Sequence, residues 1–256
     1  MISKSELKLI RALKSKKQRD KMNMFVAEGA KLVEHYNTNN MVLKNVFHLE
    51  SYGGDLWSED KKVTEKEMQQ ISSLESASPI LAIFEKPDFQ VDFSSDIMLA
   101  LDDVRDPGNM GTIIRLADWF GVSTIFCSPN CVDVFNSKVV QSTMGSLSNV
   151  NVARQELSEV FKEAKNNGIH VIGAEMKGTA LSKFETNNRL MLVMGNEANG
   201  INPENQKLLD ESITIEKAKT SQAESLNVAM ATSILLGRLS SYLRFKQLHF
   251  CSRRKN

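Results

Sequence analysis

The sequence predicts an α/β protein of two domains, the second of them built on a mostly parallel sheet. The 256 residues, 41% of them apolar, are enough for two domains of ordinary size. From residue 97 onward, short apolar runs typical of strands alternate with amphipathic segments typical of helices. Between the halves, the polar stretch KPDFQVDFSSD at 86–96 has a proline and no periodicity. We therefore expect domains over residues 1–90 and 91–256.

The first domain is expected to be a small α/β unit. Ser3 and Glu6 have the spacing of a capping box, and apolar side chains then recur at helical period. An amphipathic helix should therefore begin near residue 4, with its lysines facing outward. Farther along, the apolar patterns predict an extended segment and a helix for FVAEGAKLVEHY (25–36), and strands for MVLKNVFHLE (41–50) and PILAIFEKP (79–87).

The second domain follows a strict alternation of strands and helices. The predicted strands are IMLALDD (97–103), STIFC (123–127), NVNVAR (149–154), HVIGAEM (170–176), RLMLVMGNE (189–197) and SITIEK (212–217). The predicted helices are NMGTIIRLADWF (109–120), NSKVVQSTMGSL (136–147), LSEVFKEAKNNG (157–168), PENQKLLDE (203–211) and a last one from about Ser225. Ligands of such sheets bind at the carboxyl ends of the strands, so the site is expected there.

Charge is distributed unevenly, although the formal net charge is only +1. The first 21 residues contain eight basic side chains and two acidic ones, and the segment from Arg238 to the end contains basic side chains and no acidic one. A solvated helix face and a polar tail would account for this pattern. A polyanionic partner is the alternative.

Metal, disulfide and membrane functions are not expected. Cys127, Cys131 and Cys251 have neither zinc-site spacing nor the even number of a disulfide framework, which indicates a reducing compartment. The four histidines are scattered, without an HExxH pairing. No signal-peptide core and no apolar run long enough to span a bilayer is visible in the sequence. We expect a cytoplasmic protein that binds no metal.

The segment LDDVRDPGNMGTIIRLADWFGV (101–122) has glycines where a predicted strand gives way to a helix. A dinucleotide-binding turn needs three glycines in the pattern G-x-G-x-x-G, whereas Gly108 and Gly111 are spaced G-x-x-G and no third glycine follows at that spacing. This disfavours a dinucleotide enzyme. The segment offers instead Asn109 at the helix cap and Arg115 farther into the helix, where an arginine is usually a surface ion-pair partner.

Two further segments carry residue types that commonly bind ligands, one where a predicted strand ends and one where a predicted helix begins. LVMGNEANGIN (192–202) ends a strand with Gly195, Glu197 and Gly200, so that backbone can approach a ligand and one carboxylate can point toward it. AESLNVAMATSILL (223–236) is expected to begin a helix at about Ser225, with Asn227 in the first turn. The packing stripe of that helix is expected to consist of Leu226, Ala229, Met230 and Ile234. Taken singly, each segment has an ordinary structural explanation.

Together and in this order, the three segments resemble the SpoU (TrmH-like) family of RNA ribose 2′-O-methyltransferases, in the SPOUT superfamily. The residues that match the three motifs are, in order, Asn109, Gly111 and Arg115; Gly195, Glu197 and Gly200; and Glu224, Ser225, Leu226, Asn227 and Val228. FVAEGAKLVEHY resembles the start of the family's ribosomal-protein-like RNA-binding domain. The third motif departs from the family pattern, because Glu216 stands where proline is frequent and no glycine precedes Ser225.

The resemblance implies an SPOUT-type parallel sheet with a C-terminal trefoil knot, preceded by a small RNA-binding domain. It implies that S-adenosyl-L-methionine is the cofactor and that structured RNA, ribosomal RNA before transfer RNA, is the substrate. A homodimer whose interface borders the active site is also implied. The expected cofactor-binding residues are Gly195, Ile215, Leu226, Ala174 and Met194, and the expected RNA-binding residues are Lys14, Lys16, Lys17 and Lys21.

The resemblance also implies catalytic roles. The family assigns proton removal from the ribose hydroxyl to the arginine of the first motif, here Arg115. Because arginine keeps its proton in proteins, two roles stay open: a base with an unusually low pKa, or a cation that anchors phosphate and stabilises the forming alkoxide. Asn109 and Asn227 would orient Arg115 or the ribose.

Two residues complete the expected catalytic set, and one other class of function stays open. Ser225 could hydrogen-bond Arg115 across the dimer, and Glu197 could hold the arginine or the helix start. A non-catalytic RNA-binding relative would keep the fold without the activity. The presence of Asn109, Arg115, Glu197 and Asn227 weighs against that alternative.

Overall fold

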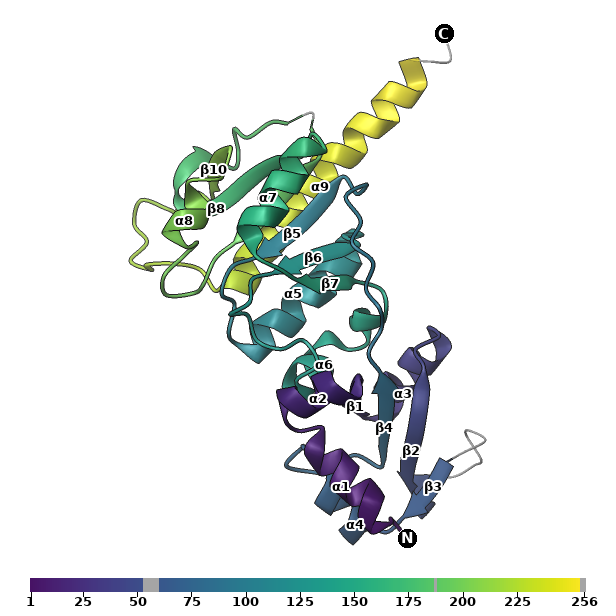
Figure 1. Cartoon of the computed structure of the whole chain (residues 1–256). Coiled ribbons are helices and arrows are strands. Elements are labelled where there is room, and N and C mark those ends of the chain that lie inside the picture. Colours follow the sequence, from purple (N-terminus) through teal and green to yellow (C-terminus); the bar gives the residue numbers. More distant parts are fainter. Residues whose placement is uncertain (53–59, 187, 254–256) are drawn as a thin grey trace. The chain divides into compact units, whose positions relative to one another are not determined.

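The computed structural model describes residues 1–52, 60–186 and 188–253, with side chains through residue 241. Its contacts divide the chain into two compact units (Figure 1). Unit 1 comprises Met1–Asp88 and Asp133–Asn149, and unit 2 comprises Phe89–Val132 and Val150–Asn256. The basic side chains that follow Arg238 near the carboxyl terminus lie outside the described side chains.

Unit 1 contains a small mixed sheet of four strands in the order β1-β4-β2-β3. The strands are β1 (Met24–Glu28), β2 (Leu43–Leu49), β3 (Asp60–Val63) and β4 (Ile80–Glu85). The helices are α1 (Lys4–Ala12), α2 (Lys16–Met22), α3 (Ala30–Thr38), the 3₁₀ turn η1 (Glu50–Tyr52), α4 (Glu65–Ile71), α6 (Ser137–Thr143) and the 3₁₀ turn η2 (Ser146–Ser148). The strands pair antiparallel except for β2 and β3, which are parallel.

The first helix forms for the reason that the sequence predicts. The Ser3 hydroxyl accepts a hydrogen bond from the Glu6 backbone N–H, and the Glu6 carboxylate accepts one from the Ser3 N–H. Such a cap stabilises a helix by about 1 kcal/mol. The buried face of α1 then packs Ile10 and Leu13 into a core with Phe47 and Leu81 of the sheet.

Residues 133–149 belong to unit 1 by their contacts. They lie after the domain boundary expected near residue 90, on the side that was assigned to the second domain. The buried Arg19 side chain donates to Asp133, and the rings of Phe25 and Phe135 lie 5.0 Å apart between centroids. A boundary based on local composition gives two continuous domains. It cannot reveal that a later segment joins the first core through long-range contacts.

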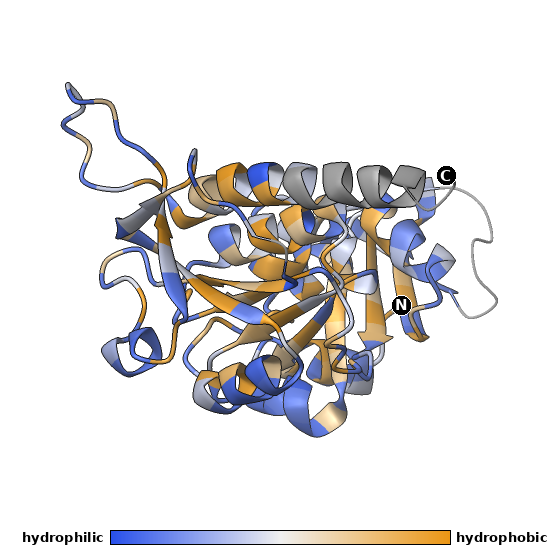
Figure 2. Cartoon of the chain, turned by 90° about the horizontal axis from the view of Figure 1, so that it is seen from above, coloured by the Kyte–Doolittle hydropathy of each residue, from blue (hydrophilic) through white to orange (hydrophobic). Residues whose placement is uncertain are grey.

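Unit 2 contains a six-stranded sheet in the order β10-β8-β9-β5-β6-β7, and all its neighbouring strands are parallel. The strands are β5 (Ile97–Leu101), β6 (Thr124–Cys127), β7 (Asn151–Arg154), β8 (His170–Ala180), β9 (Leu190–Met194) and β10 (Glu211–Thr214). The helices are α5 (Pro107–Phe120), α7 (Leu157–Asn166), α8 (Pro203–Gln206) and α9 (Val228–Arg253). The predicted strand and helix alternation is confirmed, and the central strands are hydrophobic along their length (Figure 2).

Two helices in unit 2 begin at other residues than expected. Helix α5 begins at Pro107, because Asp106 caps it and proline suits the first helical position, so Asn109 lies in the first turn and not at the cap. Helix α9 begins at Val228, because the Asn227 side chain accepts hydrogen bonds from the N–H groups of Ala229 and Met230. The prediction of a start at Ser225 was therefore wrong by three residues.

The expected packing stripe of α9 was also wrong. Within the chain only Ala229 of that stripe is buried, whereas Leu226, Met230 and Ile234 are 49%, 60% and 43% exposed. The other buried residues of α9 are Val228, Thr232, Leu235, Leu236, Leu239 and Ser240. Among the helices of the described residues, none combines the length and hydrophobicity of a membrane-spanning segment.

The hydrogen-bonded carboxylate of Glu6 makes the stability of unit 1 sensitive to acid. Burial by itself raises the pKa of Glu6, but hydrogen bonds from Lys61 and Ser3 outweigh it and lower the pKa to about 2. The stabilisation is therefore complete above the ordinary pKa of 4.5 and is lost as the pH falls from 4.5 toward 2.

We expect Glu6→Gln to reduce the loss of stability between neutral and acidic pH. The free energy of unfolding of unit 1, measured in urea at both pH values, checks this. Glu34→Gln is the control, because Glu34 is an exposed acid on another helix of the same unit. Equal pH dependence of the two variants would contradict the role assigned to Glu6.

Candidate functional site

The three predicted motifs meet in unit 2 through a chain of side-chain hydrogen bonds. The Asn109 amide on α5 donates to the Glu197 carboxylate over 2.7 Å, and the Asn227 amide donates to the Asn109 side-chain oxygen over 2.9 Å. These residues are about 90 and 120 positions apart in sequence. The sequence singled out all three, and the fold brings them together.

Helix ends hold this network in place. The Asp106 carboxylate accepts from the backbone N–H of Asn109 and thereby fixes the first turn of α5. Asn227 uses its side-chain oxygen to cap α9, which leaves its NH₂ group for Asn109. Each amide therefore has a defined orientation, because its oxygen and nitrogen have different partners.

The loop after β9 folds back on itself beside the network. Asn196 and Gly200 exchange backbone hydrogen bonds, and the Asn196 side chain donates to the Asp103 carbonyl. The buried Asp102 carboxylate at the end of β5 accepts from the Asn202 N–H and the Asn205 amide. Asp102 was not predicted from the sequence, although a carboxylate directly after a buried strand is a usable signal.

Removing the Asp102 carboxylate is expected to loosen this loop. Asp102→Ala leaves two donors without their acceptor, which costs about 2 kcal/mol of unfolding free energy. Glu204→Ala on α8 is the control, because its carboxylate is exposed and pairs, among the described residues, with Lys207 alone. A change within about 0.5 kcal/mol is expected. Denaturant unfolding of both variants is the measurement, and equal stabilities would contradict the assignment.

A pocket of about 1060 Å³ opens beside the network. Segments of β8, the loop after β9, the loop after β10 and the start of α9 line it, so it lies at carboxyl ends of parallel strands as expected. The lining includes all five expected cofactor residues, Ala174, Met194, Gly195, Ile215 and Leu226, and also Glu197 and Ser225. Asn109, Arg115 and Asn227 do not line it.

Gly195 is required by close backbone packing at this pocket. A Cβ atom at residue 195 would lie 2.2 Å from the Gly200 carbonyl carbon and 2.3 Å from the Ile201 nitrogen. Real Cβ contacts are never this short, and backbone atoms cannot move aside as a flexible side chain can. Gly200 has a left-handed φ of 69°, which favours glycine there as well.

The loop between β10 and α9 forms one wall of the pocket and extends away from the sheet (Figure 1). The Glu216 carboxylate, at the position where proline is frequent in the family, accepts from the Ser182 N–H. Lys217 donates to the Ala223 carbonyl over 2.8 Å and so closes the loop on itself. These two polar contacts fix the part of the loop in which the family pattern has proline and glycine.

Arg115 does not join the network within one chain. Its side chain is exposed on α5, and no hydrogen bond or ion pair of Arg115 is present among the described residues. Glu197 is engaged by Asn109 and not by the arginine, and Ser225 lies at the pocket. Trp119, one helical turn after Arg115, is 82% exposed on the same face of α5.

The expected RNA-binding lysines lie in unit 1 at the turn between α1 and α2 and on α2. All four are exposed, but Lys14 donates to the Ser72 carbonyl and Lys16 pairs with Asp20. Lys17 and Lys21 have no described ion pair. Within residues whose side chains are described, no group of three or more His, Cys, Asp or Glu side chains could hold a metal ion.

Comparisons with known proteins agree with this geometry. A model of the SpoU rRNA Methylase family matches residues 96–237, and a model of the MRM3-like substrate binding domain matches residues 4–82. The chain is 29% identical over 229 residues to the 23S rRNA (guanosine(2553)-2′-O)-methyltransferase RlmP of Bacillus subtilis, covering 88% of this chain and 91% of that protein.

Two solved structures share the fold over nearly the whole chain. A putative RNA methyltransferase of the TrmH family from Porphyromonas gingivalis is 32% identical with a TM-score of 0.85, covering 93% of this chain and 98% of that chain. An AdoMet-bound rRNA methyltransferase from Sinorhizobium meliloti is 30% identical with a TM-score of 0.82, covering 95% and 97%. Because the first family model spans more than half of the sequence, the protein belongs to the SpoU rRNA methylase family, whose members are S-adenosylmethionine-dependent RNA methyltransferases.

Proposed function

We propose that this enzyme methylates a ribose 2′-hydroxyl of ribosomal RNA. The observation that carries the proposal is the hydrogen-bonded chain Glu197–Asn109–Asn227, which joins three distant motifs beside the large pocket. The match to a substrate-binding domain over residues 4–82 supports an RNA substrate. The name of the Bacillus relative supports ribosomal RNA, and transfer RNA is the alternative.

The residues at the pocket fit S-adenosylmethionine. The cavity is of the size that small-molecule cofactors occupy, and the glycine-bounded loop leaves backbone groups close to its wall. We propose that Gly195, Ile215 and Leu226 hold the cofactor through backbone groups, with Ala174 and Met194 packing beside them. When bound, the cofactor supplies a methyl group on a positively charged sulfur, and no metal is needed for its displacement.

Arg115 is proposed to act on the ribose and its neighbouring phosphate. An exposed guanidinium without a described partner is free to bind a phosphate through two parallel hydrogen bonds. It would then stabilise the alkoxide that forms at the 2′-oxygen. In the alternative role, Arg115 is itself the base and must give up the proton of its guanidinium. Both roles require Arg115 at the reacting hydroxyl.

The site is proposed to be completed in a homodimer. Four large apolar side chains are exposed on or beside two helices that pack together, α5 and α9. They are Trp119 on α5, Leu226 just before α9, and Met230 and Ile234 on α9. Exposed apolar surfaces of this kind are typical of subunit interfaces. Ser225 of one protomer would then bind Arg115 of the other. The trefoil knot and a cytoplasmic location are likewise proposed, from the family resemblance and from the cysteine pattern.

Charging this apolar surface is expected to produce monomers. The double variant Met230→Glu and Ile234→Glu places two carboxylates where an interface would be desolvated. Val42→Glu is the control, because Val42 is 54% exposed and lies in unit 1. Light scattering after size exclusion should give a dimer for the wild type and the control and a monomer for the double variant. A dimer in all three would contradict this interface.

A transfer assay tests the function. Purified protein is incubated with labelled S-adenosylmethionine and, separately, with unmodified ribosomal and transfer RNA. Transfer to ribosomal RNA is the expected result, and transfer to transfer RNA alone would establish the alternative substrate. RNA binding without transfer to either would indicate a non-catalytic relative and overturn the proposal.

A further inference from the structure

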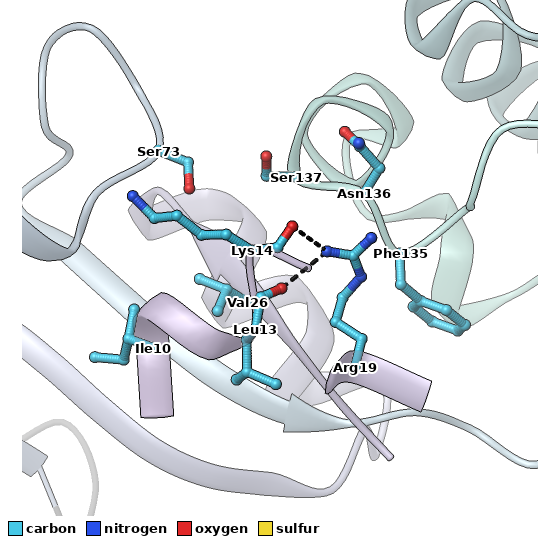
Figure 3. Close-up of a pocket in the computed structure, with 9 residues that line it drawn as sticks. All are labelled: Ile10, Leu13, Lys14, Arg19, Val26, Ser73, Phe135, Asn136 and Ser137. Atoms are coloured by element: carbon cyan, nitrogen blue, oxygen red, sulfur yellow. Dashed lines mark hydrogen bonds between the residues drawn. The ribbon is translucent and has the colours of Figure 1, made fainter. Parts of the chain in front are cut away.

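A second pocket lies within unit 1, apart from the cofactor residues. It has a volume of about 260 Å³ and is formed by the turn between α1 and α2, the segment after α4 and the start of α6 (Figure 3). Its polar lining consists of Lys14, Arg19, Ser73, Asn136 and Ser137. No carboxylate is among the described residues that line it.

The pocket presents hydrogen-bond donors. Lys14 uses one of its three ammonium protons for the Ser72 carbonyl, at 3.0 Å, and two remain. The hydroxyls of Ser73 and Ser137 have no hydrogen-bond partner among the described residues. Figure 3 shows the Lys14 side chain extending toward Ser73, with Ser137 across the opening.

Arg19 shapes the pocket without being available as its ligand. Its guanidinium donates to the carbonyls of Leu13 and Lys14 (Figure 3). It also donates to the Asp133 carboxylate, and its side chain is buried. These bonds fix the backbone of Lys14 relative to the segment that leads into α6. The backbone from which the Lys14 side chain extends is therefore held in place before any ligand binds.

The carboxylates near the pocket are already paired, so the positive charges of Lys14 and Lys138 are available to attract an anion. Asp133 neutralises Arg19, and the buried Glu28 carboxylate is occupied by the Ser72 hydroxyl and the Ser73 N–H. Lys138, next to Ser137 on α6, is exposed and has no described ion pair. An acceptor-only ligand with negative charge matches this set of groups.

We propose that this pocket binds one phosphate group of the substrate RNA backbone. A phosphodiester offers only acceptors, and lysine and serine side chains are common phosphate ligands at protein–nucleic acid interfaces. The inference rests on the proposed function, because it takes RNA to be the substrate. It assigns Lys14, Ser73 and Ser137 a shared role in placing the RNA, distinct from the catalytic role of Arg115.

Ser137→Asp tests the proposal, because it places a negative charge at the pocket. An acid in the first turn of a helix is favourable, so the variant is expected to fold, which circular dichroism checks. Ser5→Asp is the matched control, since it adds the same charge to the first turn of α1. Affinity for a ribosomal RNA fragment is measured at several salt concentrations.

We expect Ser137→Asp to bind RNA at least about tenfold more weakly than Ser5→Asp, the effect of losing one charge-assisted hydrogen bond. Its salt slope should be shallower by about 0.7 to 0.9, which corresponds to one phosphate contact. Lys14→Gln should behave likewise and Lys66→Gln, an exposed lysine of α4, should not. Coincident salt plots for Ser137→Asp and Ser5→Asp would overturn the proposal.

Two further readouts separate this proposal from others. Titration with inorganic phosphate distinguishes the sources of the anion: Ser137-dependent phosphate binding with unchanged RNA affinity would overturn the RNA assignment. Methyl transfer by the wild type is the second readout. If the wild type bound RNA through this pocket but transferred no methyl group, the proposed function would fail and the phosphate site would stand.

Discussion

Arg115→Ala is expected to lower methyl transfer by about 100-fold or more while leaving the affinity for S-adenosylmethionine nearly unchanged. The reason is that Arg115 is exposed on α5 and does not line the cofactor pocket. A group used on the RNA ribose in the transition state affects turnover more than cofactor binding. Single-turnover kinetics and calorimetric titration of the cofactor measure the two quantities separately.

Thr112→Ala is the matched control, because Thr112 is exposed one turn earlier on the same helix. Arg115→Lys keeps the charge but not the planar fork, so it should recover only part of the activity. If Arg115→Ala retained more than about a tenth of the wild-type turnover, the barrier would differ by no more than about 1.4 kcal/mol, and the catalytic assignment would be wrong.

Gly195→Ala is expected to weaken S-adenosylmethionine binding by about tenfold or more, since forcing packed backbone to move costs about 1 to 3 kcal/mol. The added Cβ would lie 2.2 Å from the Gly200 carbonyl carbon, so the loop that lines the pocket must move. Calorimetric titration of the cofactor, at a temperature where circular dichroism shows the variant to be folded, is the measurement.

Gly237→Ala provides the comparison for this substitution. A Cβ there would lie 3.7 Å from the Phe120 ring, an ordinary contact, and alanine favours a helix over glycine. Its cofactor affinity should equal that of the wild type. Wild-type affinity in a folded Gly195→Ala protein would show that the loop after β9 does not hold the cofactor.

Local signals predicted the elements that local interactions determine. The capping box of Ser3 and Glu6 gave the start of α1, and the apolar runs of unit 2 gave each strand of a parallel sheet. Helix α4 was missed although Thr64 and Glu67 form a second capping box, so this omission was avoidable. Strand β3 is short and polar, and only its pairing with β2 makes it a strand.

The remaining differences arise from contacts that periodicity does not specify. The pattern of Met230 and Ile234 indicates an apolar helix face, but it cannot tell whether the same chain or a second copy covers that face. The sequence predicts Arg19 to be one more exposed basic residue on a helix. In the structure its side chain is buried and hydrogen-bonded to Asp133. Its partner is 114 residues away, too far for local reasoning.

The identity of the methylated atom tests the proposed ribose 2′-O-methylation most directly. RNA labelled by the wild-type enzyme is digested to nucleosides, and the position of the methyl group is read by mass spectrometry; a second substrate carries 2′-deoxyribose at the modified nucleotide. We expect a methyl group on the ribose 2′-oxygen and no transfer to the deoxy substrate, because the 2′-hydroxyl is the proposed nucleophile. A methyl group on a base, or undiminished transfer to the deoxy substrate, would contradict it.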